Sequence, residues 1–325
     1  MNYQHNQPNV VVIGGGHGLA NMLRGLKKQF SNITAIVTVS DDGGNSGQLR
    51  DELGMLPPGD IRNCIAALAK TEPTMDRLLN YRFTEGTLTG QCFGNLFLAA
   101  MNGISDSFDE AVRKVSSVLA IQGRVLPVTN SNIHLEAEFD NGERCLGESK
   151  IFYAKKVNNC RIRQVRLVPE HPPALPESIE AIRTADIILM GPGSLYTSII
   201  PNFLVQGIGE AVAQSHALRI FIMNIMAQDG ETEGYSGYDH IKAFLEHAPH
   251  TLDVCLANNK PLSAETLKPY EMEGVGPIEL EREKIEALGI EVREYPFAKD
   301  ERYIRHDCDV LTEAVAEIYQ QKNGR

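Results

Sequence analysis

The chain has 325 residues and a formal net charge of −11 at pH 7, from 31 Lys and Arg against 42 Asp and Glu. An acidic balance of this size repels nucleic acid and anionic membrane surfaces, so neither is an expected partner. Hydrophobic residues make up 42% and charged residues 22% of the chain, which excludes the intrinsically disordered class.

Short apolar runs that end in Gly, Asp or Asn, each followed by helical periodicity, recur along the chain. This alternation is typical of a parallel sheet between helices. We therefore expect the α/β class, a Rossmann-like and mostly parallel sheet flanked by helices, in a single domain over residues 1–325. The expected strands are 9–13, 33–39, 186–190, 218–223 and 252–256, and the expected helices are 19–30, 60–70, 94–102, 108–120 and 310–318, the last capped by Asp307 or Asp309.

The pattern changes between residues 123 and 168, where apolar and polar residues alternate. Two alternating runs, 133–139 and 145–153, stand on either side of the Asn-Gly pair at Asn141 and Gly142. Because Asn-Gly favours a two-residue turn, the sequence predicts an antiparallel β-hairpin inserted on the main sheet.

The first strand enters a glycine-rich turn that is the strongest local indication of a ligand. Such a turn brings backbone N–H groups and the positive end of a helix dipole to one point, where a phosphate can bind. The candidate ligand-binding residues are Gly14, Gly15, Gly16, His17 and Gly18. Leu19 stands where the dinucleotide fingerprint has its third glycine, so the turn departs from the NAD motif. A glycine turn that only permits close packing of helix on strand is the alternative.

Acidic residues follow the second expected strand, at the same edge of the sheet. Asp41 and Asp42 open a loop rich in turn formers, where a carboxylate could accept hydrogen bonds from ribose or hold Mg²⁺ beside phosphates. A solvated Asp-Gly turn is the alternative. Asp60 follows two prolines at a helix start, which suits an N-cap and a ligand contact equally well.

A second strand-to-helix turn of phosphate-binding shape follows residues 186–190. Its candidate residues are Gly191, Gly193 and Ser194, and the alternative is an ordinary capped helix. Two such turns in one sheet indicate a ligand with two phosphates, or one long ligand that bridges the crevice.

Three more polar residues are candidates in the last third of the chain. Asn224 and Asn258 end later strands, where each could bond a base or sugar or act as a turn residue. Arg305 stands beside a His-Asp pair and can make bidentate contacts to phosphate, with a surface ion pair to Asp307 as the alternative.

The sequence carries no membrane or secretion signal. Residues 1–8 are polar, lack an apolar h-region and are predicted to be flexible. No run of about 18 apolar residues, the minimum for a membrane span, occurs. The six cysteines form no C-x-x-C pair, which fits a reducing compartment. We therefore expect a cytoplasmic protein without a membrane span.

Six ordered segments together resemble the gluconeogenesis factor (YvcK-type) family, which is related to 2-phospho-L-lactate transferase (CofD). They are residues 10–19, 36–47, 57–63, 94–96, 191–198 and 304–307. The resemblance implies a Rossmann-like fold and binding of UDP-sugars such as UDP-N-acetylglucosamine. It also implies a role in cell shape and in growth on gluconeogenic carbon sources, without an established reaction.

The resemblance assigns further residues. In the gluconeogenesis factor branch, Tyr270 and Arg305 match the residues that contact the nucleotide sugar, and Cys308 stands where some relatives carry a phosphorylatable threonine. In the transferase branch, which uses Mg²⁺ and a guanosine diphosphate-linked donor, positions similar to Asp41 or Asp42, Asp60 and Asn95 line the site.

Two main hypotheses follow. The first is a regulatory protein whose affinity for an unknown protein partner depends on a bound nucleotide sugar, required for cell shape and cell-wall homeostasis during gluconeogenic growth. The alternative is a phospholactyl-transferase-like enzyme in which Asp42 and Asp60 are catalytic and hold Mg²⁺. NAD is a third candidate for the crevice, and whether the chain is an enzyme or forms a homo-oligomer stays open.

Overall fold

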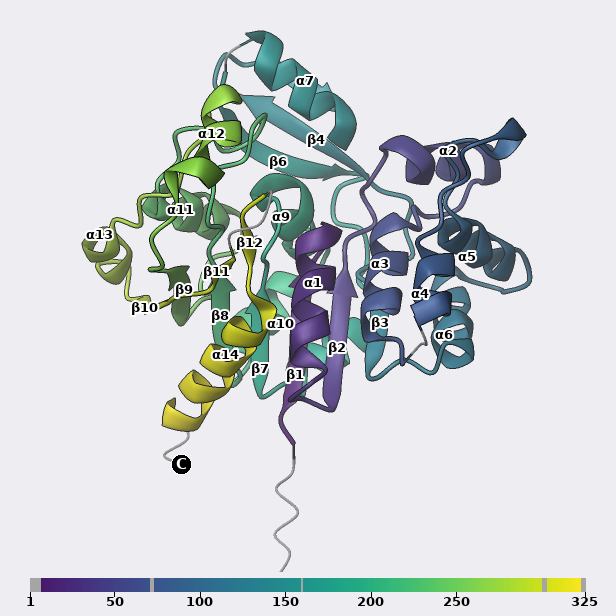
Figure 1. Ribbon diagram of the computed structural model, residues 1–325, viewed down its shortest axis with the longest axis horizontal. Helices are drawn as coiled ribbons and strands as arrows, with labels where there is room; N and C mark the ends of the chain where they lie inside the picture. The colour runs from purple at the N-terminus through teal and green to yellow at the C-terminus, as the bar shows by residue number, and fades with distance from the viewer. Residues whose placement is uncertain (1–6, 71–72, 159, 300–302, 323–325) are drawn as a thin grey trace, which may run out of the picture.

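A seven-stranded parallel sheet forms the centre of the computed structural model, which describes residues 7–70, 73–158, 160–299 and 303–322 (Figure 1). The strands lie in the order β10 (Glu291–Tyr295), β9 (Val254–Asn258), β8 (Leu218–Ile222), β7 (Ile187–Met190), β1 (Asn9–Gly14), β2 (Asn32–Val37) and β3 (Arg124–Pro127). The expected fold class is confirmed. Of the segment 1–8, predicted to be flexible, residues 1–6 lie outside the described residues.

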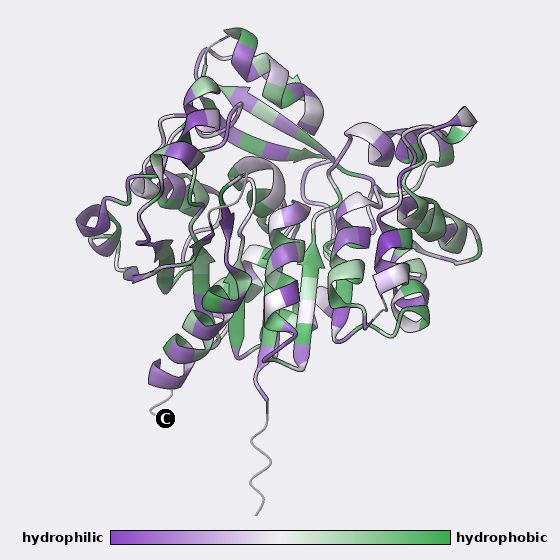
Figure 2. Cartoon of the chain, viewed as in Figure 1, coloured by the Kyte–Doolittle hydropathy of each residue, from purple (hydrophilic) through white to green (hydrophobic). Residues whose placement is uncertain are grey.

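The middle strands are buried on both faces, which is why they read as unbroken apolar runs. Val10, Val11, Val12 and Ile13 of β1 are at most 2% exposed. Figure 2 shows the central strands mostly in the colour of hydrophobic residues, while the surrounding helices carry both hydrophobic and hydrophilic residues.

The strand order reverses at β1. Val10 pairs with Ile33 of β2 on one side and with Ile187 of β7 on the other. The chain first extends the sheet from β1 to β3 and then returns to build β7 to β10 on the opposite edge of β1. In open α/β sheets, such a reversal leaves a crevice at the carboxyl ends of the two strands.

Helices cover both faces of this sheet. In Figure 1, α1 lies in front of it and packs against α3 on one side and α14 on the other. The helices outside the small sheet are α1 (Gly16–Leu26), α2 (Gly44–Leu53), α3 (Gly59–Leu68), α4 (Pro73–Leu79), α5 (Phe93–Gly103), α6 (Phe108–Val118), α8 (Pro176–Arg183), α9 (Ile200–Phe203), α10 (Ile208–Gln214), α11 (Gly237–His247), α12 (Ala264–Met272), α13 (Arg282–Glu286) and α14 (Cys308–Lys322). Short turns of helix also occur at Gly86–Leu88 and Leu195–Ile199.

The antiparallel part is built differently from the predicted insertion over 123–168. Residues 124–127 form β3 and belong to the main sheet, parallel to β2. A separate antiparallel sheet then has the order β5 (Arg144–Leu146), β4 (His134–Phe139) and β6 (Ile162–Val168), and the Asn-Gly pair joins β4 to β5 as predicted.

The second run of the predicted hairpin, 145–153, is wrong beyond Leu146. Gly147 has a φ of +110°, a conformation that ends the strand and favours glycine. Helix α7 (Glu148–Asn158) follows and packs on β4.

The structure corrects the predicted loop after the second strand and confirms the predicted cap of the last helix. The loop predicted over 40–47 becomes helical at Gly44, where α2 begins. Asp307 is the cap of α14, since its Oδ1 accepts the N–H groups of Asp309 at 3.1 Å and Val310 at 3.3 Å. Within the described part of the chain, none of the helices has the length and apolar character to cross a membrane.

Candidate ligand-binding site

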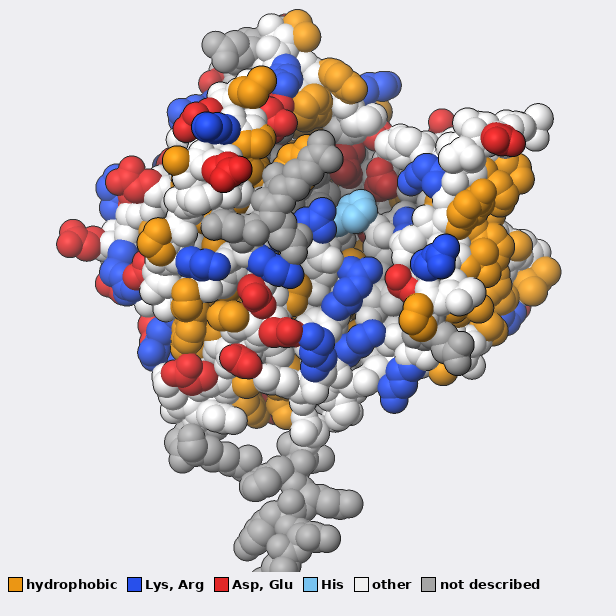
Figure 3. Space-filling view, viewed as in Figure 1, with side chains coloured by type: hydrophobic (Ala, Val, Ile, Leu, Met, Phe, Trp, Pro, Cys, Tyr) orange, Lys and Arg blue, Asp and Glu red, His pale blue; other side chains and the backbone are white. Residues whose placement is uncertain are grey.

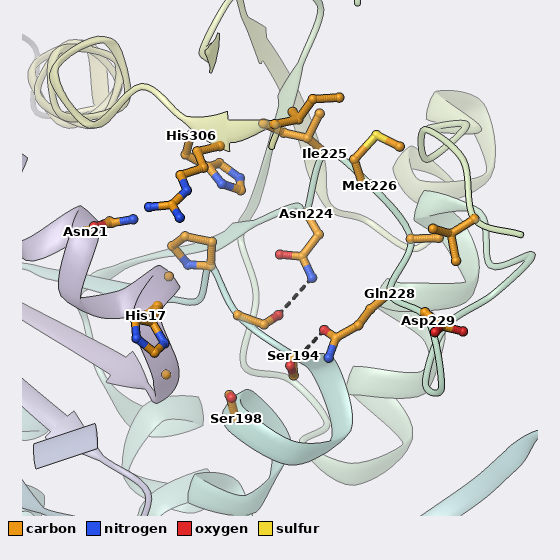
Figure 4. A pocket seen from close by; sticks show the side chains of 18 of the residues that line it. His17, Asn21, Ser194, Ser198, Asn224, Ile225, Met226, Gln228, Asp229 and His306 are labelled. Carbon is orange, nitrogen blue, oxygen red and sulfur yellow. Dashed lines mark hydrogen bonds between the residues drawn. The ribbon is translucent and has the colours of Figure 1, made fainter. Parts of the chain in front are cut away.

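A cavity of about 590 Å³ lies at the carboxyl ends of β1 and β7, where the strand order predicts a crevice (Figure 4). Its volume falls within the range of about 300–1,000 Å³ that is usual for small-molecule sites. The predicted residues that line it are Gly15, Gly16, His17, Gly18, Gly193, Ser194, Asn224, Tyr270 and Arg305. Gly14, Asp41, Asp42, Asp60, Asn95 and Gly191 are not part of its wall.

The two glycine turns touch each other at the floor of the cavity. Gly16 has a φ of +68°, which favours glycine, and α1 begins there. A Cβ on Gly18 would lie 2.6 Å from the carbonyl oxygen of Pro192, so the second turn can approach only because residue 18 has no side chain. The first turn therefore needs glycine for the packing of the two turns, in addition to the close approach of a ligand to the backbone.

Asp60 lies beneath the first turn and outside the cavity. Its Oδ2 accepts the backbone N–H of Gly16 at 2.7 Å, and a Cβ on Gly15 would meet the same oxygen at 2.7 Å. Burial and the neighbouring Asp41 carboxylate raise the pKa of Asp60 to about 6. Asp60 therefore supports the glycine turn, and its own helix α3 receives no side-chain cap from it.

The second turn already holds a protein carboxylate. Oε1 of Glu231 accepts the N–H groups of Tyr196 at 3.1 Å and Thr197 at 3.0 Å, at the start of the helical turn after Ser194. Glu231 is 3% exposed, and burial raises its pKa to about 7. The N–H groups that a second phosphate would need here are thus taken, and Ser194 donates its hydroxyl to Gln228 Oε1 at 2.7 Å instead of capping the helix.

The opposite wall comes from a hairpin of β11 (Ala298–Lys299) and β12 (Arg305–His306). The ring of His306 stacks on Phe297, with centroids 5.2 Å apart, and its Nε2 donates to the carbonyl of Met223 at 3.1 Å. Burial lowers the pKa of His306 to about 4, so the ring is neutral near pH 7. His306 thereby fixes the strand that carries Arg305 into the cavity.

Tyr270 acts on the same strand. Its hydroxyl accepts the backbone N–H of Ile304 at 2.8 Å, one residue before Arg305. Tyr270 and Arg305, which the family resemblance pairs, are therefore neighbours in the structure. Asn224, from the end of β8, donates its Nδ2 to the carbonyl of Gly193 at 2.8 Å and joins this wall to the second turn (Figure 4).

The predicted acidic residues lie in two different places. Asp41 accepts the N–H of Gly43 at 2.9 Å, and burial raises its pKa. Asp42 faces away and accepts the N–H of Ser149 at 2.8 Å, at the start of α7. Asp41 therefore faces the start of α3, where a Cβ on Gly59 would lie 3.3 Å from its Oδ2 and where its charge raises the pKa of Asp60, whereas Asp42 contacts α7.

Asn95 belongs to an amide network on the other side of α3. Its Nδ2 donates to Asn45 Oδ1 at 2.7 Å, and its Oδ1 accepts from Arg62 at 3.2 Å. The described residues include no group of three or more His, Cys, Asp or Glu side chains arranged for a metal ion.

Known proteins share this architecture. A family model described as 2-phospho-L-lactate transferase CofD matches residues 10–298. A putative gluconeogenesis factor from Thermoanaerobacterium thermosulfurigenes is 52% identical over 309 residues, which cover 95% of this chain and 96% of that relative. The chain belongs to the gluconeogenesis factor family. The predicted family is thus confirmed.

Further gluconeogenesis factor relatives agree with this assignment. The gluconeogenesis factor of Bacillus subtilis is 44% identical over 319 residues, which cover 97% of this chain and 99% of that protein. A crystal structure of a Bacillus halodurans protein matches with a TM-score of 0.92 and 42% identity, covering 96% of this chain and 99% of that chain.

Part of the site in this gluconeogenesis factor homologue has no clear signal in the sequence. Phe152 of α7 lines the cavity and packs on Gly230, where it fills the space that a Cβ would need. Gln228 and Glu231 belong to the same loop after β8. The one local indication that this loop belongs to the site was the turn pair Asp229-Gly230, which follows β8 at the carboxyl edge of the sheet.

Proposed function

We propose that the protein binds a nucleotide sugar of the UDP-N-acetylglucosamine type in this cavity. In this proposal it acts as a regulatory protein that supports cell shape and cell-wall homeostasis during gluconeogenic growth. The observation that carries the binding proposal is that the Gly16–Gly18 turn, the start of α1 and Arg305 open onto one cavity. The names of the relatives support the link to gluconeogenesis.

The chemistry of the wall suits a diphosphate joined to a larger group. The start of α1 supplies N–H groups and the positive end of a helix dipole, and Arg305 supplies a fixed cation. Burial, followed by the cations of Arg62, Arg305 and Arg24, lowers the pKa of His17, so positive charge reaches this side of the cavity. Ile225, Met226 and Phe152 offer apolar contact to a ring or an acetyl group.

A partner protein can distinguish the liganded from the free chain, because residues from separate elements line the cavity. Its wall combines the first turn, the loop after β8, the β12 strand and Phe152 of α7. A ligand that contacts all four favours the arrangement in which they are closed together, and a protein partner that prefers this arrangement then binds more tightly.

The test is calorimetric titration of the full chain with UDP-N-acetylglucosamine, beside an Arg305→Ala variant. Loss of a charge-assisted contact should weaken binding by about tenfold or more. Arg77→Ala is the matched control, because Arg77 is exposed on α4 and lies outside the cavity wall. No binding to the wild-type chain, or equal affinity in the Arg305 and Arg77 variants, would reject the proposal.

A transferase-like enzyme is the second candidate, because the Asp60 carboxylate lies directly behind the glycine turn and the charge of a second carboxylate, Asp41, acts on it. Mg²⁺ in phosphate sites takes one or two carboxylates and completes its shell with phosphate oxygens and water. Asp41 and Asp60 fit this demand, whereas Asp42 does not. When bound, Mg²⁺ would neutralise charge on a diphosphate donor.

The same titration separates the candidates. Binding of GDP that requires Mg²⁺ and is lost in Asp41→Asn favours the transferase, with Asp42→Asn as the control. Binding of NAD alone would instead point to a redox substrate.

A further inference from the structure

A second cavity of about 290 Å³ adjoins the first, on the outer side of Arg305. Asn21, Arg305 and His306 line both cavities, so the two cavities are neighbours. Arg24, Lys28, Lys299 and Arg305 bring cations to the second cavity, which we call the basic pocket. Figure 3 shows Lys and Arg side chains gathered over α1, with Asp and Glu side chains next to them toward α14.

The carboxylates of the basic pocket are largely engaged. Asp307 caps α14, as described above. Asp309 pairs with Lys28 at 2.6 Å, but both side chains are about 60% exposed, and such exposed pairs contribute little. An incoming anion can therefore compete for Lys28. Of the described residues that line this pocket, four are Lys or Arg and two are Asp. In a chain with a net charge of −11, this concentration of cations is a local exception.

The cations are held by elements that pack closely. Arg24 lies in the last turn of α1 and Lys28 in the turn of chain that follows this helix, and Arg24 donates to Asn21 Oδ1 at 2.8 Å. Gly25 has no room for a Cβ against the backbone of Cys308, so α1 and the start of α14 are fixed against each other. The third wall is the β11–β12 hairpin, which carries Lys299 and Arg305.

We propose that the basic pocket binds an oxyanion, a phosphate or carboxylate group, next to the ligand in the main cavity. The anion has two chemical sources. It is either a charged group on the sugar of the bound nucleotide sugar, which would then be an acidic sugar and not N-acetylglucosamine, or a separate phosphate-bearing molecule that binds beside an uncharged nucleotide sugar. The first source rests on the proposed function, whereas the second can be measured without it.

The experiment uses the full chain and an Arg24→Ala, Lys28→Ala double variant, which leaves Arg305 intact. UDP-glucuronate carries a carboxylate where UDP-glucose carries a hydroxymethyl group, so the ratio of their affinities measures recognition of that charge. If the ligand supplies the anion, UDP-glucuronate binds the wild-type chain about tenfold more tightly than UDP-glucose does, and the double variant binds the two ligands with nearly equal affinity.

The second arm titrates inorganic phosphate, with and without saturating UDP-glucose. Phosphate binding that persists beside UDP-glucose and is lost in the double variant assigns the pocket to a separate anion. The charge-matched control is Arg77→Ala with Lys150→Ala, two exposed cations outside both cavities.

The outcomes separate this proposal from the proposed function. If no UDP-sugar binds but phosphate binding depends on Arg24 and Lys28, the basic pocket stands and the nucleotide-sugar site fails. If neither UDP-glucuronate preference nor phosphate binding differs between the double variant and its control, the basic pocket is refuted, whatever UDP-glucose does. Equal thermal unfolding midpoints of both variants exclude misfolding as the cause.

Discussion

At Gly18 the two turns of the cavity leave no space for a side chain. Gly18→Ala would force Cβ against the carbonyl of Pro192, 2.6 Å away, and separate the turns. We expect a loss of about 1–3 kcal/mol in the free energy of unfolding and loss of ligand binding. Gly103→Ala is the control, because its Cβ meets nothing within 4 Å, and its effect should be neutral or stabilising by up to about 1 kcal/mol. Urea unfolding measures the free energy of unfolding of both variants, and equal values would contradict the packing argument.

Asp60 makes the stability of the fold depend on pH. Its pKa is about 6 in the folded chain against an ordinary value of 3.8, so the folded state holds the proton more tightly than the unfolded state. The free energy of unfolding should therefore fall as the pH rises between about 4 and 6, and Asp60→Asn should remove about 1–3 kcal/mol of this loss. Unfolding at about pH 4.5 and pH 7.5 tests this. Parallel pH profiles of the two proteins would show that Asp60 ionises at its ordinary pKa.

At the scale of elements, α7 is attached to the loop after β8 by a buried ion pair. Lys155, 7% exposed, pairs with Glu233, while Lys156 pairs with Asp229. Removing one partner of a buried pair leaves an uncompensated charge. In Lys155→Ala, amide hydrogen exchange over residues 148–158 should rise at least tenfold while β1 and β7 stay protected. Lys150→Ala, an exposed residue of the same helix, should change nothing. Unchanged exchange in Lys155→Ala would mean that α7 is held by its apolar contacts alone.

The elements also show what the sequence could predict. Five strands of the main sheet, β1, β2, β7, β8 and β9, were predictable because burial on both faces makes them continuous apolar runs bounded by Gly, Asp or Asn. The edge strands β3 and β10 were not predicted, because β3 is only four residues long and β10 has a single buried residue, Val292. Helix α7 was not, because Cys145 to Tyr153 alternates like a strand and the break depends on the backbone conformation of Gly147.

Of the site, the glycine turns and Arg305 were predictable from local pattern. Glu231 was not, because its contact with Tyr196 and Thr197 links residues 34 and 35 positions apart. The assignment of all residues to one domain stays a prediction, as does each ligand contact.

For the molecule as a whole, a ligand that binds only the folded chain must raise its stability. At a concentration one hundred times the dissociation constant, the gain is about 2.7 kcal/mol. This concentration of UDP-N-acetylglucosamine should therefore raise the thermal midpoint of the wild-type chain by several degrees, and that of Arg305→Ala by about half as much or less, since tenfold weaker binding lowers the gain to about 1.4 kcal/mol. Differential scanning calorimetry measures this, and equal shifts in both proteins would place the ligand elsewhere.

The position of β1 at the reversal of the strand order also governs how the protein is made. Asn9 and Asp186, which are hydrogen-bonded at this seam, lie 177 residues apart. During synthesis on the ribosome, β2 and β3 can join β1 early, but the other edge of β1 waits until β7 has left the exit tunnel. An open, apolar strand edge invites mispairing, so this interval is when a nascent chain needs chaperone protection. The ligand cavity comes into existence only when the second half docks on β1, late in folding.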